Sequence, residues 1–229
     1  MISIKHRFSG ATLCEFDVET VKEAVLLAIK KCSDLSGSDL RGINLSGSDL
    51  RGSDLSGSDL SGSNLSYSNL SGSNLSYSDL SGSDLRGINL SYSNLRYSDL
   101  SYSNLRYSDL SGSNLRGSNL RYSDLSGSNL SYSNLRGSDL SGSSLRGSNI
   151  EGEKITINPL SISGLRYWCL ITDGFMRLGC KRFSHSEWSA FSNEHIEEMD
   201  THALEFWSQW KEPLLSMCAT HANKKIEEV

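Results

Sequence analysis

The sequence has no long apolar run, and no stretch approaches the roughly 18 residues that a membrane span needs. Residues 1–7 lack the charged-then-apolar pattern of a secretion signal. The five cysteines are odd in number and scattered, at positions 14, 32, 169, 180 and 218, so no disulfide framework suggests itself. The net charge is -5, and no segment is basic enough for nonspecific nucleic-acid binding. These absences predict a reduced cytoplasmic protein that binds neither membranes nor nucleic acid directly.

What the chain does have is a strict period of five. Every fifth residue from Leu35 to Ile150 is leucine except the last, which gives 24 consecutive units that read Ser-Asp/Asn-Leu-Ser/Arg-Gly/Tyr. A period of five fits neither a helix nor a flat strand, whose side chains repeat at 3.6 and 2 residues. It fits a chain that turns a corner every five residues and stacks on itself. Four units would then make a 20-residue coil, and 24 units would make six coils.

The segment before the repeat predicts a hairpin over 2–18 followed by a helix. Ile2, Ile4 and Phe8 alternate before a turn at Ser9-Gly10, and Cys14, Phe16 and Val18 alternate after it. Thr20 and Glu23 form a capping-box pattern, and apolar residues then recur at helical spacing as far as Cys32. Residues 1–32 are therefore expected to cap the exposed end of the stack.

The segment after the repeat predicts a second hairpin and then helices. The five-residue register continues through residues 151–165 with poorer neighbours, so we assign 33–165 to the repeat and 166–229 to a C-terminal region. Asp173-Gly174 lies between two apolar runs, which is a strong hairpin signal. Ser184 with Glu187 predicts a second capping box, and Ser192 and Asp200 are candidate N-caps. Pro213 is expected to kink or restart the last helix.

The five-residue unit resembles the pentapeptide-repeat family, whose pattern is a small residue, Asp or Asn, Leu or Phe, and two variable residues. The resemblance implies a mainly β fold, a right-handed quadrilateral β-helix of about six coils, with the leucine and the small residue pointing inward. Here the inward small residue is serine in almost every unit, with Ile43 and Ile88 as exceptions. A buried hydroxyl without a partner costs about 1–3 kcal/mol, so these serines are expected to bond to backbone carbonyls or stacked neighbours. The flanks look similar to those of bacterial and phage pentapeptide-repeat proteins of unassigned function.

If a coil is 20 residues long, outward residues 20 apart form columns. The expected partner-binding columns are an acidic one, a basic one and two tyrosine pairs: Asp39, Asp59, Asp79 and Asp99; Arg96, Arg116 and Arg136; Tyr77 with Tyr97; and Tyr102 with Tyr122. The outward positions carry Tyr, Ser, Gly, Asn, Asp and Arg, a composition close to that of antibody loops, which bind protein surfaces. The alternative is that stacked tyrosines only stabilise neighbouring coils, by about 0.2–1 kcal/mol per pair.

The acidic column allows a second interpretation. Some pentapeptide-repeat proteins are similar to DNA in width and charge and occupy the DNA groove of a topoisomerase, so the resemblance implies a DNA mimic as one alternative. However, aspartate and asparagine are about equally frequent in this position, and the repeat contains nine arginines beside eleven aspartates. The repeat is therefore a poor polyanion.

The C-terminal region carries the remaining candidates. Cys180, His185 and Asp200 allow a third alternative, a small metal or catalytic site, but no CxxC or HxxxH pair supports it. All four tryptophans lie in this region, and Trp207, Trp210 and Leu214 follow one helical stripe that could pair two copies. The sequence predicts a non-catalytic binding or scaffold protein without a cofactor, displaying an Asp/Asn/Arg/Tyr surface to a protein partner, with a homodimer through the C-terminal region.

Overall fold

A computed structural model describes residues 1–31, 34–162 and 164–227, so Cys32 lies outside the described residues. The chain divides into two compact units, Met1–Lys154 and Ile155–Val229. No helix among the described residues combines the length and apolar character that crossing a membrane requires.

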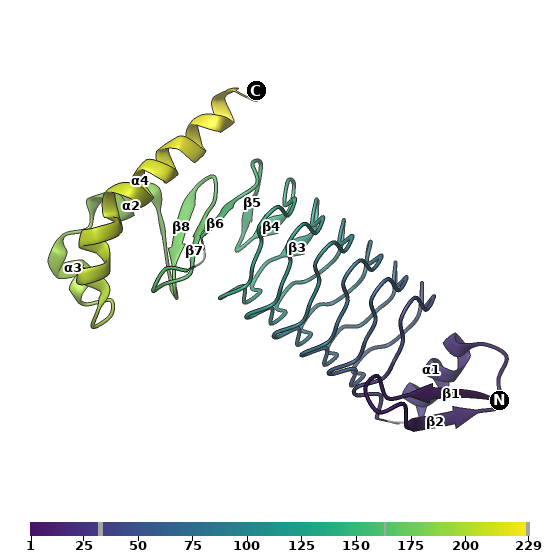
Figure 1. The fold of residues 1–229 in the computed structure, drawn as a ribbon. Helices are drawn as coiled ribbons and strands as arrows, with labels where there is room; N and C mark the ends of the chain where they lie inside the picture. The colour runs from purple at the N-terminus through teal and green to yellow at the C-terminus, as the bar shows by residue number, and fades with distance from the viewer. Residues whose placement is uncertain (32–33, 163, 228–229) are drawn as a thin grey trace. The chain divides into compact units, whose positions relative to one another are not determined.

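The first unit begins with the expected hairpin and helix (Figure 1). Strand β1 (Ile2–Lys5) pairs antiparallel with β2 (Thr12–Phe16), and helix α1 (Val21–Lys30) follows with both halves of the predicted capping box present. Phe8 was expected to continue the first strand, but it lies in the connecting loop and is 80% exposed. The loop residue Arg7 and strand β1 bond to the first coil, because Arg7 N donates to Gly37 O and Asp39 N donates to Lys5 O. Backbone groups at this end of the stack are thereby paired.

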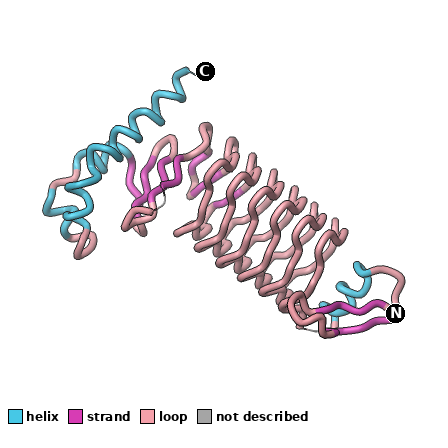
Figure 2. Tube along the Cα trace, viewed as in Figure 1, coloured by secondary structure: helices cyan, strands magenta, loops and turns pink. Residues whose placement is uncertain are grey.

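The repeat winds as stacked coils in which paired residues are 20 apart (Figures 1 and 2). Parallel bridges run without a break from Asp39↔Asp59 to Asp124↔Ser144, and β3 (Asn129–Leu130) and β4 (Asn149–Ile150) continue the pairing. The last strand of the unit, β5 (Glu153–Lys154), pairs antiparallel with β4. The leucine of each unit points inward and is at most 6% exposed. The core is therefore built from stacked leucines.

The inward serines are satisfied mainly by the backbone. In most of the stack each hydroxyl donates to the carbonyl of the preceding unit's leucine, as Ser83 Oγ does to Leu80 O at 2.6 Å. A few in the first coils donate to a leucine of the preceding coil, as Ser78 Oγ does to Leu55 O at 2.9 Å. This bears out the expected backbone partners for most inward serines, which thereby avoid the desolvation penalty of a free hydroxyl. Four inward hydroxyls have no partner among the described residues, those of Ser48, Ser53, Ser63 and Ser128.

The described residues of the second unit form a four-stranded antiparallel sheet and three helices. The strands lie in sequence order, β6 (Leu160–Ile162), β7 (Cys169–Ile171), β8 (Phe175–Leu178) and β9 (Lys181–Ser184). The helices are α2 (His185–Ala190), α3 (Asn193–Glu197) and α4 (Ala203–Glu227). The predicted hairpin is confirmed, because β7 and β8 pair around Asp173-Gly174.

The boundary between the units differs from the predicted one at residue 165. Strand β6 pairs with β7, and the second compact unit begins at Ile155, although the leucine register is still in phase at Ile155, Leu160 and Leu165. Ser184 and Ser192 cap helices as predicted. Asp200 instead accepts the amide of His202 ahead of α4, and α4 runs through Pro213 without restarting.

Candidate functional site

The predicted acidic column is present in the repeat. Parallel bridges join Asp39 to Asp59, Asp59 to Asp79 and Asp79 to Asp99, and the column continues through Asn119 to Asp139. Four successive units separate paired residues, so the repeat has four such columns. Consecutive units occupy neighbouring columns, and the unit of Arg96 directly precedes the unit of Asp99.

The carboxylates of the acidic column have a local structural role. Asp59 Oδ1 accepts hydrogen bonds from the amide of Ser61 at 3.1 Å and from the hydroxyl of Ser61 at 2.7 Å. Asparagine does the same elsewhere, since Asn64 Oδ1 accepts the amide of Ser66 at 3.0 Å. This is an Asx turn that holds the corner of the coil, and it needs an oxygen rather than a charge. The column is therefore explained in part by folding alone.

Five of the nine arginines in the repeat pair with aspartates, within their own corner, in the next coil or both. Arg41, Arg51 and Arg86 each bind the aspartate at the second position before them, with Nη2 at 2.6–2.7 Å from the carboxylate. Their guanidinium hydrogen bonds hold the pKa of Asp39, Asp49 and Asp84 below the ordinary value. Arg106 and Arg121 instead reach an aspartate of the next coil, Asp124 and Asp139 respectively, at 3.8 Å.

The predicted basic column has neither kind of partner. In Arg96, Arg116 and Arg136 the second position before the arginine is asparagine, and the equivalent positions in the next coil hold Asn114, Asn134 and Lys154. Among the residues that the structure describes, none of these three arginines forms an ion pair. Arg116 and Arg136 are exposed, and Arg96 is half-buried with its guanidinium 5.3 Å from the ring centroid of Tyr97.

All eight repeat tyrosines occupy left-handed corners of the coil. Their φ angles lie between 56° and 61°, in the position that is glycine in the other units. A positive φ is rare for a bulky residue, and it costs about 1–2 kcal/mol relative to the right-handed region. Eight corners of the repeat are therefore strained, and each of them places an aromatic ring on the surface. Backbone strain of this kind clusters at functional sites.

The rings lean toward the next coil. Tyr77 stacks on Tyr97 with ring centroids 5.4 Å apart, and Tyr102 stacks on Tyr122 at 5.2 Å, as predicted. In five of the six places where the next corner is glycine the ring covers it, so that a Cβ added at Gly87 would lie 2.7 Å from Tyr67 Cδ1; Gly152, the next corner after Tyr132, is not covered. Stacking and corner glycines thus order the rings without hiding them, since the four stacked tyrosines remain 43–67% exposed.

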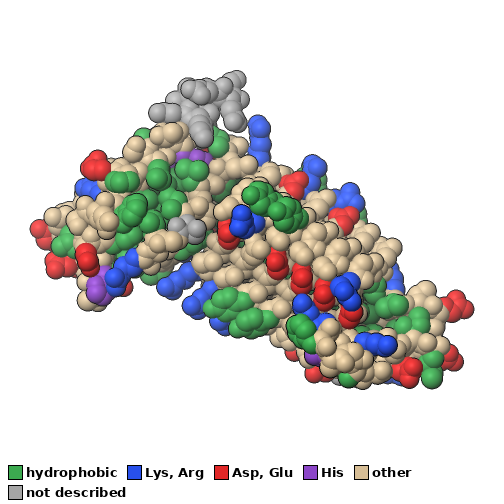
Figure 3. Space-filling model, viewed as in Figure 1, with side chains coloured by type: hydrophobic (Ala, Val, Ile, Leu, Met, Phe, Trp, Pro, Cys, Tyr) green, Lys and Arg blue, Asp and Glu red, His purple; other side chains and the backbone are tan. Residues whose placement is uncertain are grey.

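The tyrosines do not share one face. Each of the four corner columns holds two of them: Tyr77 and Tyr97; Tyr102 and Tyr122; Tyr67 and Tyr107; Tyr92 and Tyr132. Only the first two pairs occupy adjacent coils and stack. The pair Tyr77 and Tyr97 lies in the same column of units as Arg96. The pair Tyr102 and Tyr122 lies in the neighbouring column, which contains Asp99. In Figure 3 green side chains stand in small separate groups on the repeat, with blue and red ones between them.

Removing the strain at one corner should raise stability. Tyr132 is 90% exposed and stacks on no ring among the described residues, so Tyr132→Gly is expected to stabilise the protein by about 0.5–1 kcal/mol. Urea unfolding followed by circular dichroism measures this. Tyr97→Gly is the matched control. Its gain in stability should be smaller, because this variant also loses the ring contact with Tyr77. A destabilised Tyr132→Gly protein would mean that the corner is not strained by tyrosine.

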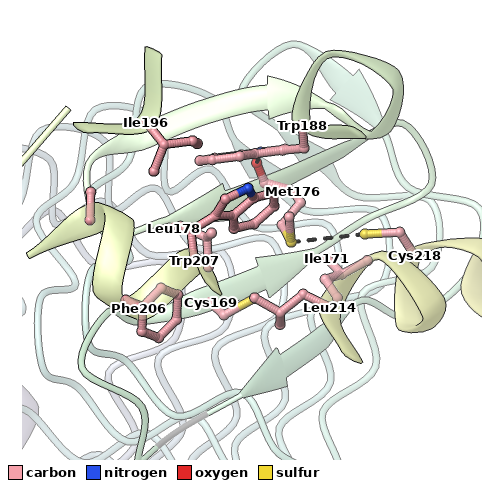
Figure 4. Packing of buried hydrophobic residues seen from close by; sticks show 11 residues of the cluster. Cys169, Ile171, Met176, Leu178, Trp188, Ile196, Phe206, Trp207, Leu214 and Cys218 are labelled. Atoms are coloured by element: carbon pink, nitrogen blue, oxygen red, sulfur yellow. Dashed lines mark hydrogen bonds between the residues drawn. The ribbon is translucent and has the colours of Figure 1, made fainter. Parts of the chain in front are cut away.

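The predicted dimerisation residues are placed in the core of the second unit. Trp207 is 2% exposed and Leu214 is fully buried, and they pack with Cys169, Met176 and Trp188 (Figure 4). Their contacts are thus with the unit's own sheet and helices. Trp210 is only partly buried, which leaves it as the predicted residue that retains an accessible surface.

The C-terminal cysteine and histidine candidates do not converge. Within the described residues no group of three His, Cys, Asp or Glu side chains could hold a metal ion. Asp200, one of the three candidates, accepts hydrogen bonds from the hydroxyl of Tyr167 and the amide of His202. Burial raises the pKa of Cys169 to about 12 and that of Cys218 to about 11, so both thiols are protonated at neutral pH and suit a core role.

The repeat matches the sequence model of a known protein family. The family model described as pentapeptide repeats matches in 8 copies over residues 31–66, 53–91, 68–106, 93–131 and 123–152. These ranges together span residues 31–152, more than half of the 229 residues. No curated protein matches the chain.

Three solved structures are similar to part of the chain. A pentapeptide repeat protein from the thylakoid lumen of Arabidopsis thaliana is 32% identical, over 47% of this chain and 71% of that one, with a TM-score of 0.36. HetL, involved in heterocyst differentiation regulation in Nostoc sp. strain PCC 7120, is 24% identical over 58% and 82%, with a TM-score of 0.31. Trypsin-treated QnrB1, a plasmid-mediated fluoroquinolone resistance protein, is 18% identical over 50% and 70%, with a TM-score of 0.22. TM-scores below 0.5 carry no conclusion about this chain.

Proposed function

Since this chain belongs to the pentapeptide-repeat family, we propose that it is a non-catalytic binding or scaffold protein that presents its repeat to a protein partner. The repeat in this proposal is the right-handed, four-sided β-helix of about six coils that the family resemblance implies. The binding surface comprises two neighbouring columns, the one with Tyr77 and Tyr97 and the one with Tyr102 and Tyr122.

The observation that carries the proposal is the exposed tyrosine at left-handed corners. Glycine occupies the same corner in most units without strain, so folding alone favours glycine there. Tyrosine and arginine are enriched among the residues that dominate interface energies, because a large rigid ring or planar guanidinium buries area at low entropic cost. Guanidinium groups lie 5.3–5.5 Å from the ring centroids at Tyr97, Tyr107 and Tyr122, which joins both residue types on the surface.

A second candidate function is DNA mimicry against a DNA-handling enzyme such as a topoisomerase. The stacked carboxylates from Asp39 to Asp99 favour it. Three members of the full column have arginine partners, since Arg41 lies against Asp39 and Asp59, and Arg121 lies against Asp139. The neutralised carboxylates weaken the polyanionic field on which mimicry depends, so we rank protein binding first.

A pull-down with the full-length protein tests both functions. The variant replaces Tyr77, Tyr97, Tyr102 and Tyr122 with glycine, which the other corners already use, so the coil is expected to persist. We expect a partner from bacterial lysate to be retained at low and at moderate salt, with or without duplex DNA, and to be lost with the variant. Tyr67, Tyr107, Tyr92 and Tyr132 replaced together give the matched control, which should retain it.

Other results would contradict the proposal in recognisable ways. A partner that duplex DNA displaces and salt weakens would put mimicry first, because that binding is electrostatic. Equal retention by the wild type and the four-glycine variant would remove the tyrosine columns as the binding surface. If neither retains anything, presentation of the repeat to a protein partner is unsupported.

A further inference from the structure

The column formed by Arg96, Arg116 and Arg136 is unusual in this repeat because its charge is not neutralised. We call these three residues the arginine stripe. Their backbones stack in register, since Tyr97 N donates to Arg116 O and Gly117 N donates to Arg136 O. Neighbouring coils lie about 4.8 Å apart, and two like charges at that spacing repel by about 0.9 kcal/mol even in water.

No guanidinium N–H of the stripe donates a hydrogen bond to another described residue. In Arg41, Arg51 and Arg86 the Nε–H donates to a carboxylate, as Arg41 Nε does to Asp39 Oδ1 at 2.8 Å and Arg86 Nε does to Asp84 Oδ1 at 2.9 Å. Arg96 Nε is buried and has no acceptor among the described residues. Within the repeat, the stripe is therefore the place where three stacked arginines lack the carboxylates that the other columns supply.

Asparagine and tyrosine border the stripe. The side chains next to the three arginines are the neutral amides of Asn94, Asn114 and Asn134, and Asn94 Nδ2 donates to Asn74 Oδ1 at 3.0 Å. On the other side, at the Arg96 end, the stacked pair Tyr77 and Tyr97 offers an exposed aromatic platform, with exposed fractions of 65% and 43%, whereas glycine follows Arg116 and Arg136. The surface thus combines a narrow line of positive charge with an apolar edge.

We propose that the arginine stripe binds an extended acidic peptide segment of a protein partner, with an apolar side chain of that segment resting on Tyr77 and Tyr97. This inference rests on the proposed binding function and names the chemistry of the partner. Carboxylates match the planar fork of a guanidinium, which favours two parallel hydrogen bonds. Three coils span about 10 Å, and an extended chain rises about 3.3 Å per residue, so an acidic run of about four residues covers the stripe.

The neighbouring column argues for a narrow peptide over a broad polyanion. Next to the stripe stand Asp79, Asp99 and Asp139, and among the described residues Asp79 and Asp99 have no arginine partner. A nucleic acid wide enough to cover both columns would bring phosphates against these carboxylates. A single extended strand can lie along the arginines alone.

Fluorescence anisotropy with a defined peptide tests the inference. The probe is a fluorescein-labelled peptide with four consecutive glutamates followed by leucine, and the control peptide has four glutamines instead. We expect the full-length protein to bind the glutamate peptide at low salt, and the replacement of Arg96, Arg116 and Arg136 by glutamine to weaken binding at least tenfold. The matched variant replaces Arg51, Arg86 and Arg121 by glutamine, which lowers the net charge equally, and should weaken binding less than threefold.

The outcomes separate this inference from the proposed function. If both triple variants weaken peptide binding equally, binding responds to net charge alone. That result would overturn the arginine stripe as the peptide-binding site. Tighter binding of a fluorescein-labelled oligothymidylate than of the glutamate peptide would overturn the peptide assignment. If no peptide binds while the tyrosine-dependent partner is still retained in the pull-down, the stripe inference fails and the proposed function stands.

Discussion

Replacing Leu70 with alanine is expected to lower the free energy of unfolding by about 2–5 kcal/mol. Leu70 is fully buried, and so are Leu50 and Leu90, its counterparts in the coils on either side. Each coil of a repeat protein contacts only its neighbours, so no distant side chain can move into the space left by the lost methyl groups. The cavity therefore persists between two coils.

Urea unfolding followed by circular dichroism measures this loss, and Ser71→Ala is the control. Ser71 is the next residue in the same unit, but its side chain faces outward and is half-buried. The control is expected to change the free energy of unfolding by less than about 0.5 kcal/mol, which is usual for surface substitutions. A loss below about 1 kcal/mol for Leu70→Ala would show that the neighbouring coils collapse onto the gap.

Alanine at a corner glycine gives the second large effect, and two glycines with similar φ angles differ in what covers them. Gly87 and Gly82 have φ angles of 61° and 63°, so alanine is equally strained at either. A Cβ at Gly87 would lie 2.7 Å from Tyr67 Cδ1, whereas a Cβ at Gly82 would meet nothing within 4 Å. We expect Gly82→Ala to destabilise by about 0.5–1 kcal/mol, and Gly87→Ala by about a further 1–2 kcal/mol.

A double-mutant cycle with Tyr67→Gly isolates the contribution of the ring. With the ring removed, the additional cost of Gly87→Ala should disappear, leaving a loss similar to that of Gly82→Ala. Thermal and urea unfolding of the four proteins supply the cycle. If the extra loss survives in the double variant, the clash is with the backbone and not with the tyrosine.

Most of the first unit could be predicted from residue spacing. The leucine register determined which side chains are buried, and it correctly placed Asp39 with Asp59 and Tyr77 with Tyr97. The helix starts at Val21 and His185 were also predictable, because a capping box is a local pattern whose two hydrogen bonds join residues close in the chain.

Other features were not readable from the leucine register. Strand β6 keeps that register, yet it pairs with β7 in the second unit, because pairing depends on which edge is available and not on spacing. Trp207 and Leu214 lie on a helical stripe that fits an interface and a core equally well, and only the packed sheet and helices made them core residues. Phe8 fits an alternating strand, but the turn of the hairpin began before it.

The sequence by itself determined the period, the inward leucines and the columns of like residues, because these follow from spacing along the chain. The sequence also shows that one position of the unit is always glycine or tyrosine. In the structure that position is a corner of positive φ. Only the tertiary structure decided which arginines are neutralised, how the rings lean and which corners they cover. Those properties depend on atoms of neighbouring coils, which are distant along the chain and whose side chains meet only after the chain has stacked.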